Sequence, residues 1–425
     1  EFHVNTYTTD EQYNSRIVTR PDGDFIVVWD SRGSDGTDTD GASVQGQRYS
    51  PGGAPNGSQF QINTITTYWQ GSPDIGVDAN GNFVVVWWGA NPDDLGNDYS
   101  DIRGQRFGAN GTPVGDEFRV NSYSTSDQRR AAIAVAPDGS FVVVWDGFKS
   151  TESGAGVFGQ RFAADATPLG SEFKVNTFTT GKQRFPAIAM DGDGDFVVVW
   201  ESDGSAGTDH HGRSVQGQRF AANGNMLGGE FQVNTYTTNE QYRPGVAMGA
   251  AGDFVVVWES FGTSGSDNDF ISVQARRFDS DGNPFGDAFQ VNAYTTRGQR
   301  SASVAKISEG ACVVVWESYG SYGDDVDDGV PPDRAKESVH MRRFSADGMP
   351  LNRDFQVNTY TGNQQWTPAV SVGVGSEFVV GWESRSDDPT NYLPFGIRGQ
   401  RFEENLLFAS GFEFGHTSDW SYSNP

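Results

Sequence analysis

The sequence predicts an all-β protein whose sheets close into a ring of seven four-stranded units. Three features support this: a motif repeated seven times, an apolar β-forming run in each copy, and termini that complete one another. Each copy contains a Val-Asn step (Ile-Asn in the second copy), at intervals of 58, 58, 55, 58, 58 and 66 residues. The step begins at Val4, Ile62, Val120, Val175, Val233, Val291 and Val357. A nearly constant period of this length is typical of repeat architectures.

Each copy contains four strand signals, which the copy around residue 200 illustrates. They are residues 186–190 (P-A-I-A-M), 196–202 (F-V-V-V-W-E-S), 215–220 (V-Q-G-Q-R-F) and 231–235 (F-Q-V-N-T). Asn-Gly and Asp-Gly steps recur in the turns between such signals and supply the positive φ angles that tight hairpins require. Four strands joined by these turns predict one antiparallel sheet per copy.

The second strand of each copy is apolar without alternation, as in Val197-Val198-Val199-Trp200. An unbroken run of this kind indicates that both faces of the sheet are buried. A four-stranded antiparallel sheet that is covered on both faces by like sheets is a blade of a β-propeller. The fold class is therefore an all-β, seven-bladed β-propeller.

The two ends of the chain indicate how the ring closes. Residues 1–6 (E-F-H-V-N-T) match the fourth strand of a copy, but the first three strands of that copy do not precede them. The chain ends with the first three strands of a copy, without the fourth: residues 367–372, 378–384 and 397–402. A linear array of domains gives no reason for this phase shift, whereas a ring does, because the N-terminal strand completes the last blade and removes both free edges. We predict a propeller over residues 1–402 and a C-terminal tail over residues 403–425 that packs on it.

The overall charge narrows the classes of partner. The chain carries 30 Lys and Arg against 56 Asp and Glu, a formal net charge of −26. This argues against nucleic acid and anionic membrane surfaces and favours cations or a high-salt setting. No apolar run approaches the roughly 20 residues of a transmembrane helix. The chain starts at Glu1 inside a repeat, which we interpret as a secreted protein after signal-peptide removal, although a shortened chain would start in the same way.

The repeats resemble those of large secreted bacterial proteins, including calcium-binding, adhesin-like surface proteins. The resemblance rests on V-N-T-Y-T-T-N-E-Q (233–241), G-D-F-V-V-V-W-E-S (252–260) and V-Q-G-Q-R-F (215–220), and it covers about residues 1–402. The tail also resembles the G-F-E-x-G-x-x-x-x-W ending of many secreted bacterial proteins. The resemblance implies export to the cell surface or the medium, and adhesion or ligand binding.

The loops between the second and third strands hold most of the aspartates. Oxygen-rich, Gly-rich loops suit Ca²⁺, which takes 6–8 oxygen ligands with tolerant geometry. The alternative is an acidic face that is simply solvated. The candidate Ca²⁺ ligands are Asp35, Asp38, Asp40, Asp93, Asp98, Asp267, Asp269, Asp324, Asp325, Asp327 and Asp328.

Other candidates stand out because they do not recur from copy to copy. Aromatic side chains can stack on sugar rings, and arginines at the central funnel would attract an anionic substrate. The candidate ligand-binding residues are Trp69, Trp366, Tyr242, Arg129, Arg184 and Arg300.

Residues that do recur in every copy are more readily explained as scaffold. A Gln follows the repeated Asn by seven residues in all copies, and we expect its amide to bond loop backbone. The Arg of Q-R-F and the acid after the second-strand Trp, such as Arg219 and Glu201, are expected to pair across strands. The repeated Gln residues are Gln12, Gln70, Gln128, Gln183, Gln241, Gln299 and Gln365.

We therefore expect a secreted or cell-surface binding and adhesion propeller that recognises a glycan or an extracellular protein, with Ca²⁺ in its Asp-rich loops. No catalytic residue is assigned. One alternative is an extracellular polysaccharide lyase that uses His and Tyr as base and acid, for which His210 and His211 are the loop histidines. The other is a structural subunit of a surface layer or filament.

Overall fold

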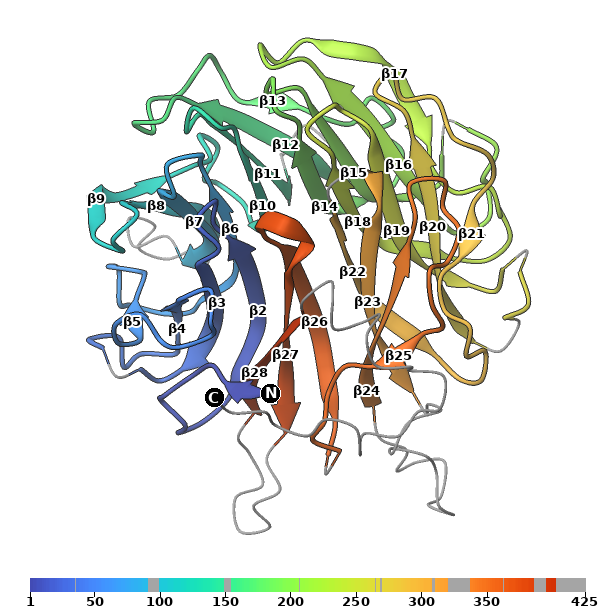
Figure 1. Cartoon of the computed structure of the whole chain (residues 1–425). Coiled ribbons are helices and arrows are strands. Elements are labelled where there is room, and N and C mark those ends of the chain that lie inside the picture. Colours follow the sequence, from blue (N-terminus) through green and yellow to red (C-terminus); the bar gives the residue numbers. More distant parts are fainter. Residues whose placement is uncertain are drawn as a thin grey trace.

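A computed structural model confirms the ring of seven four-stranded antiparallel sheets (Figure 1). In every blade the strands follow the order A–B–C–D, with strand A nearest the central axis, because neighbouring A strands such as β2 and β6 contact one another. The structure describes residues 1–34, 36–90, 99–148, 154–205, 207–263, 265–267, 270–307, 310–319, 337–361, 363–385 and 395–402. The predicted tail, residues 403–425, lies outside the described residues.

The A and B strands form the inner half of each blade. The A strands of blades 1 to 7 are β2 (Gln12–Thr19), β6 (Gln70–Val77), β10 (Gln128–Val135), β14 (Gln183–Met190), β18 (Gln241–Met248), β22 (Gln299–Lys306) and β26 (Gln365–Val372). The B strands are β3 (Phe25–Arg32), β7 (Phe83–Ala90), β11 (Phe141–Phe148), β15 (Phe196–Asp203), β19 (Phe254–Phe261), β23 (Cys312–Tyr319) and β27 (Phe378–Arg385). A short 3₁₀ turn, Val374–Ser376, joins β26 to β27.

The C and D strands form the outer half. The C strands are β4 (Ala42–Tyr49), β8 (Ser100–Phe107), β12 (Ala155–Phe162), β16 (Arg213–Phe220), β20 (Ile271–Phe278), β24 (Glu337–Phe344) and β28 (Phe395–Phe402). The D strands are β5 (Phe60–Gln61), β9 (Pro113–Arg119), β13 (Phe173–Lys174), β17 (Met226–Gln232), β21 (Phe289–Gln290), β25 (Phe355–Gln356) and β1 (Phe2–His3).

The D strands end earlier than the sequence predicts, because the repeated Asn continues the pairing with its side chain. In blade 4 the strand stops at Gln232, and Asn234 Oδ1 accepts the N–H of Val215 at 2.9 Å. The same contact occurs in every blade, and in blade 7 Asn5 Oδ1 accepts the N–H of Ile397 at 2.7 Å.

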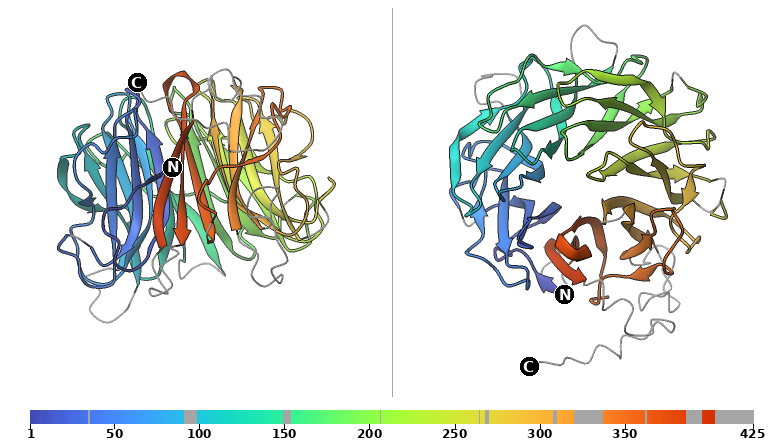
Figure 2. Two further views of the ribbon diagram at one scale, coloured as in Figure 1. Left: turned by 60° about the horizontal axis from the view of Figure 1, so that its bottom comes forward. Right: turned by 45° about the horizontal axis from the view of Figure 1, so that its top comes forward.

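The predicted closure of the ring by the N-terminal strand is confirmed. β1 pairs antiparallel with β28, with Phe2 opposite Gly399, and the blue and red ends of the chain meet in the last blade (Figure 2). Beyond β1, the N–H of Val4 donates to the carbonyl of Ile397 at 2.8 Å. The last sheet therefore has four strands like the other six.

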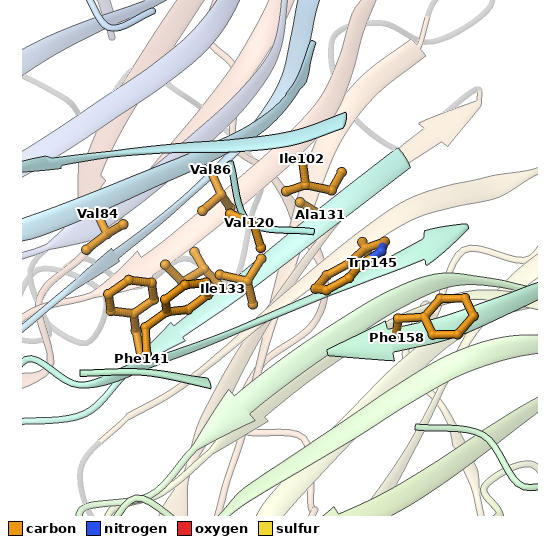
Figure 3. Close-up of a cluster of buried hydrophobic side chains, with 11 residues drawn as sticks. Val84, Val86, Ile102, Val120, Ala131, Ile133, Phe141, Trp145 and Phe158 are labelled. Carbon is orange, nitrogen blue, oxygen red and sulfur yellow. The ribbon is translucent and has the colours of Figure 1, made fainter. Parts of the chain in front are cut away.

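The core of the protein lies between neighbouring blades, as the apolar B strands predict. One cluster joins Val84, Val86 and Ile102 of blade 2 to Phe141 and Trp145 of blade 3 (Figure 3). Equivalent clusters occupy the other six blade boundaries, and all seven B-strand Trp side chains are fully buried. Each blade thus buries both faces against its two neighbours.

The repeated Gln is structural, as predicted. In blade 4, Gln183 Oε1 accepts the indole N–H of Trp200 at 3.0 Å, and its Nε2 donates to the carbonyl of Thr180 at 3.1 Å. The amide therefore satisfies a buried Trp donor and ties the D–A loop to the core at once.

The predicted cross-strand pairing of the Q-R-F arginine with the strand-B acid is wrong. The register places Arg219 opposite Val197, whereas Glu201 stands opposite Val215. In blades 1 to 5 the Arg instead donates to carbonyls in the C–D turn of the next blade; for example, Arg161 Nη1 bonds the carbonyl of Asn223 at 2.6 Å. These arginines hold adjacent blades together, and the strand-B acids have other partners.

Candidate functional site

Two sets of loops lie on one face of the ring, which we call the loop face. The D–A loops run from strand D of one blade to strand A of the next, and the B–C loops connect strands B and C within a blade. The end of each B strand bonds the D–A loop beside it; the N–H of Arg32 donates to the carbonyl of Glu11 at 2.9 Å, and Tyr319 bonds Gly298 in the same way. Each A strand begins on this face, directly after the loop. The two residues that follow each repeated Gln therefore form the rim of the loop face around the central axis.

Every A strand has a β-bulge at this rim. The register shifts after the second residue of the strand, as between Tyr13 and Arg16 in β2. A non-glycine residue with positive φ follows that second residue in all seven blades: Asn14, Ser72, Arg130, Phe185, Arg243, Ser301 and Thr367, with φ between 47° and 54°. Residues other than Gly rarely adopt this conformation, and bulges often re-aim side chains beside functional sites.

The bulges hold a ring of buried carboxyl groups. The bulge N–H groups of Asn14 and Ser301 donate to the carboxylate of the preceding blade, Glu383 and Glu259 respectively, at 2.8 Å. The six members are Asp30, Asp146, Glu201, Glu259, Glu317 and Glu383, each at most 7% exposed. Blade 2 carries Trp88 at the equivalent position.

Burial disfavours the charged form of these groups. It raises the pKa of Asp30 to about 7, that of Asp146 to about 6 and that of Glu317 to about 7. The pKa values of Glu259 and Glu383 are raised by the same cause. Asp30, Asp146 and Glu317 therefore titrate near neutral pH.

The rim has a cationic half and an aromatic half. Blades 3 to 6 supply the arginines Arg129, Arg130, Arg184, Arg243 and Arg300. Blades 7 and 1 supply Trp366 and Tyr13, and blade 2 has Gly71 there, whose backbone approaches the half-buried Trp88. Four of these arginines pair with the ring acid of their own blade, with Arg130–Asp146 at 2.9 Å and Arg184–Glu201 at 3.0 Å. Arg129 pairs with Asp127 instead.

A depression of about 410 Å³ opens where the two halves meet, between the A strands of blades 5, 6 and 7. Its lining residues are Arg243, Arg300, Ser301, Glu317, Glu337, Trp366 and Thr367. Arg300 Nη2 lies 3.5 Å from Glu317 Oε1, and the Arg243 and Arg300 side chains are 53% and 39% exposed. Two accessible guanidinium groups, two carboxyl groups and an indole ring therefore face one cavity, which is the candidate site.

The structure brings two of the predicted ligand-binding residues, Arg300 and Trp366, into this depression. Tyr242 lies next to Arg243 on β18, with the Arg213 guanidinium 5.0 Å from its ring. Arg129 and Arg184 stand on the rim of blades 3 and 4. Trp69 is 43% exposed on the D–A loop that precedes blade 2, with the Arg32 guanidinium 5.2 Å from its ring.

The sequence predicts neither acid of the depression as a site residue: Glu317 belongs to the repeated acids interpreted as scaffold, and Glu337 does not stand out at all. Glu337 begins β24, directly after the B–C loop of blade 6. A comparison of the seven copies could have identified Glu337, because no other blade has an acid at the matching position. The residues there are Ala42, Ser100, Ala155, Arg213, Ile271 and Phe395.

The described Ca²⁺ candidates have structural partners. Asp38 Oδ2 accepts from Asn63 at 2.7 Å, and Asp267 Oδ2 accepts from Asn292 at 2.8 Å, so both hold the repeated Asn. Asp40 Oδ2 accepts the N–H of Tyr68 at 3.2 Å. Within the described residues no group of three or more His, Cys, Asp or Glu side chains is placed to hold a metal. The remaining candidates, Asp35, Asp93, Asp98, Asp269, Asp324, Asp325, Asp327 and Asp328, lie outside the described residues.

The raised pKa of Asp30 predicts a pH-dependent stability. A carboxyl group whose pKa rises on folding from 3.8 to about 7 stabilises the fold fully below pH 4 and loses this contribution as the pH rises to 7. Asp30→Asn, a neutral side chain of the same shape, is expected to raise the free energy of unfolding by about 1–2 kcal/mol at pH 8. Denaturant titrations at pH 8 and pH 4 measure the difference, and an equal effect at both would contradict it.

No helix in the described part of the chain is long and apolar enough to cross a membrane. No protein-family model and no curated protein matches the sequence. Solved structures do match. An ulvan lyase, described as a new family of polysaccharide lyase, has a TM-score of 0.55 and 10% identity over 95% of this chain and 96% of that chain.

Two further structures share the architecture. A protein of unknown function from Dyadobacter fermentans has a TM-score of 0.52 and 10% identity, covering 93% of this chain and 98% of that chain. The NanB sialidase of Streptococcus pneumoniae has a TM-score of 0.50 and 9% identity, covering 95% of this chain and 70% of that chain. At this level of identity the similarities establish a common fold, and proteins that act on carbohydrates are among those that have it.

Proposed function

We propose that the protein binds an acidic polysaccharide outside the cell, in the depression between β18, β22 and β26. The observation that carries this proposal is the pair of accessible arginines, Arg243 and Arg300, beside Trp366 in one cavity. The chain as a whole is strongly acidic, with a net charge of −26. Two guanidinium groups that face one cavity therefore provide a place for an anion on a protein that otherwise repels anions. The extracellular setting is the one that the resemblance of the repeats to secreted bacterial proteins implies.

Each side chain suits a part of such a ligand. A guanidinium group forms paired hydrogen bonds with a carboxylate or sulfate group, which acidic sugars carry. The half-buried indole of Trp366 is held 5.0 Å from the ring of Phe395 and offers an apolar surface for a pyranose ring. Two anionic groups on neighbouring sugars would then meet the two arginines, while one of the two sugar rings lies on Trp366.

The neighbouring carboxyl groups make this affinity depend on pH. Glu259 and Glu317 face Arg243 and Arg300, and burial raises the pKa of both acids, that of Glu317 to about 7. Protonation of Glu317 below pH 7 removes a negative charge from the cavity and leaves the arginines free to bind an anion. Binding of an acidic glycan is therefore expected to tighten between pH 8 and pH 6.

Replacement of both arginines, Arg243→Ala with Arg300→Ala, is expected to weaken binding of an acidic polysaccharide by about 100-fold. Each lost charge-assisted hydrogen bond costs about 1.5 kcal/mol or more, and every 1.4 kcal/mol is a factor of ten. Calorimetric titration with polygalacturonate, alginate and a sulfated glucuronan measures the affinity, and neutral dextran is the ligand control.

Arg119→Ala is the matched control, because Arg119 is 40% exposed on the outermost strand of blade 2 and is remote from the depression. Equal losses in both variants, or equal binding of dextran, would refute the proposal.

Repeating the titration with EDTA tests the Ca²⁺ sites that the sequence predicts in the B–C loops. Loss of binding on chelation would support those sites.

A second candidate function, cleavage of the bound polysaccharide, is favoured by one observation: the depression contains two carboxyl groups. A polysaccharide lyase of the kind that the sequence leaves open would use His and Tyr as base and acid. His211 lies on the B–C loop of blade 4, where it lines a separate hollow with Asn239 and Glu240. The carboxyl pair supports a different chemistry.

A further inference from the structure

Blade 6 has two carboxyl groups at a place where every other blade has at most one. In the register of β23 and β24, Glu317 stands opposite Val339, and Glu337 stands opposite Tyr319. Glu317 and Glu337 are therefore diagonal neighbours on one face of the sheet, at a separation of about 7–8 Å between their backbones. Side chains at such positions can reach one another.

Blade 4 shows what these two positions do elsewhere in the ring. There the matching residues are Glu201 and Arg213, and they form an ion pair of 3.1 Å. Arg184 completes this cluster at 3.0 Å from Glu201, as Arg300 does for Glu317 in blade 6. Blade 6 thus keeps the A-strand Arg and the B-strand acid, as Arg300 and Glu317. It has Glu337 where blade 4 has Arg213, so two acids are neighbours where blade 4 has an ion pair.

The geometry around Glu337 directs it toward the cavity. Glu337 is 6% exposed and lines the depression, and its Oε2 is buried with no hydrogen-bond partner among the described residues. A buried carboxylate oxygen without a partner is costly, and a catalytic role or a bound water molecule is among the explanations for such an atom in a native protein. A ligand or water in the depression would satisfy it.

The environment of Glu317 suits a proton donor. Burial raises the pKa of Glu317 to about 7; Arg300 opposes this shift, and the charges of Glu337 and Glu259 add to it. Glu317 can therefore hold a proton near neutral pH. Cleavage of a glycosidic bond uses one protonated carboxyl group as proton donor together with a second carboxyl group nearby.

We propose that Glu317 and Glu337 hydrolyse a glycosidic bond of the acidic polysaccharide that the depression binds, with Glu317 as proton donor and Glu337 as base. This inference rests on the proposed binding function. Glu317 gives its proton to the glycosidic oxygen as the bond from that oxygen to the anomeric carbon breaks. Glu337 takes a proton from a water molecule, whose oxygen forms the new bond to the anomeric carbon. Exchange with solvent then returns a proton to Glu317 and removes one from Glu337.

Hydrolysis fits this cavity better than elimination. The described residues that line it include two carboxyl groups and neither His nor Tyr. Arg243 and Arg300 hold the anionic groups of the sugars on either side of the bond, and Trp366 supports one ring. The arginines therefore position the substrate, and the two glutamates carry the chemistry.

The test uses the full chain with polygalacturonate, alginate and a sulfated glucuronan, and it measures released reducing ends and binding affinity separately. Glu317→Gln and Glu337→Gln are each expected to lower kcat by about 100-fold or more, while the dissociation constant rises by no more than about threefold. Retained binding shows that each variant is folded. Asp146→Asn is the matched control, because Asp146 occupies the ring position of Glu317 in blade 3, which does not line the depression.

The pH profile gives a second readout. Activity of the wild-type protein is expected to fall above pH 7 as Glu317 loses its proton, and this alkaline limb is expected to disappear in the residual activity of Glu317→Gln. Binding without turnover on all three polysaccharides would overturn the hydrolytic role and leave the proposed function standing. An unsaturated, ultraviolet-absorbing product would also overturn it, in favour of elimination. Absence of binding would remove the proposed function as well.

Discussion

A chain that lacks residues 1–6 is expected to lose at least about 5 kcal/mol of its free energy of unfolding, the largest effect of a local change in this protein. These residues supply the D strand of blade 7. Their loss removes the pairing of Phe2 with Gly399, the bonds of Val4 and Asn5 to Ile397, and the burial of Val4, which is 1% exposed. Each hydrogen bond contributes about 1 kcal/mol and each buried apolar side chain about 2 kcal/mol.

The deletion also opens the ring on both sides of blade 7. The carboxylate of Glu1 accepts the N–H groups of Thr359 and Tyr360 at 2.8 and 3.0 Å, and the Tyr49 hydroxyl donates to the carbonyl of Val4 at 2.8 Å. These bonds connect blade 7 to blades 6 and 1. Without them β28 becomes a free edge, and we expect unfolding to lose its single cooperative transition.

Calorimetry and guanidinium titration of the deletion variant measure this effect. Glu230→Ala is the control, because Glu230 accepts the N–H groups of Thr177 and Phe178 at a blade boundary inside the chain. It removes one loop cap and is expected to cost about 1–2 kcal/mol. If the deletion costs no more than this control, closure by β1 does not stabilise the ring. A peptide of residues 1–8 added in trans is expected to restore part of the lost stability.

The ring, the strand order and the role of the repeated Gln could be predicted because each arises from a pattern within one copy. The apolar run of β15 indicates two buried faces, and seven copies with complementary ends require closure. The pairing of Arg219 could not be predicted in this way. Recurrence shows that Arg219 and Glu201 belong to the scaffold, but the register places them apart, and the partner of Arg219 lies in the next blade.

The candidate site was predictable only in part, for a related reason. Arg300 and Trp366 stood out because they interrupt a repeat, and both line the depression. Glu337 did not stand out, because it precedes the predicted third strand and follows a loop whose length differs from blade to blade. Only the full eight-residue register of β24 aligns it with Arg213 of blade 4 and places it beside Glu317.

Trp200→Ala is expected to lower the free energy of unfolding by about 4–6 kcal/mol, the largest effect of a single substitution. Trp200 is 0% exposed and packs in the cluster between blades 3 and 4 with Val142, Val144 and Phe220. Removal of a buried Trp side chain costs about 3–5 kcal/mol, because a cavity remains. The substitution also leaves Gln183 Oε1 without its donor, which adds about 1 kcal/mol.

Trp69→Ala is the control of the same residue type, since Trp69 is 43% exposed on the loop face and is expected to cost less than about 1 kcal/mol. Guanidinium titrations of both variants measure the difference. Similar losses would mean that the B-strand Trp residues do not form the core. Because Trp200 also anchors the Gln that ties down a D–A loop, Trp200→Ala is expected to loosen the rim of blade 4 while leaving the depression of blades 5 to 7 in place. Its glycan affinity, measured well below its melting temperature, is therefore expected to match that of the wild-type protein.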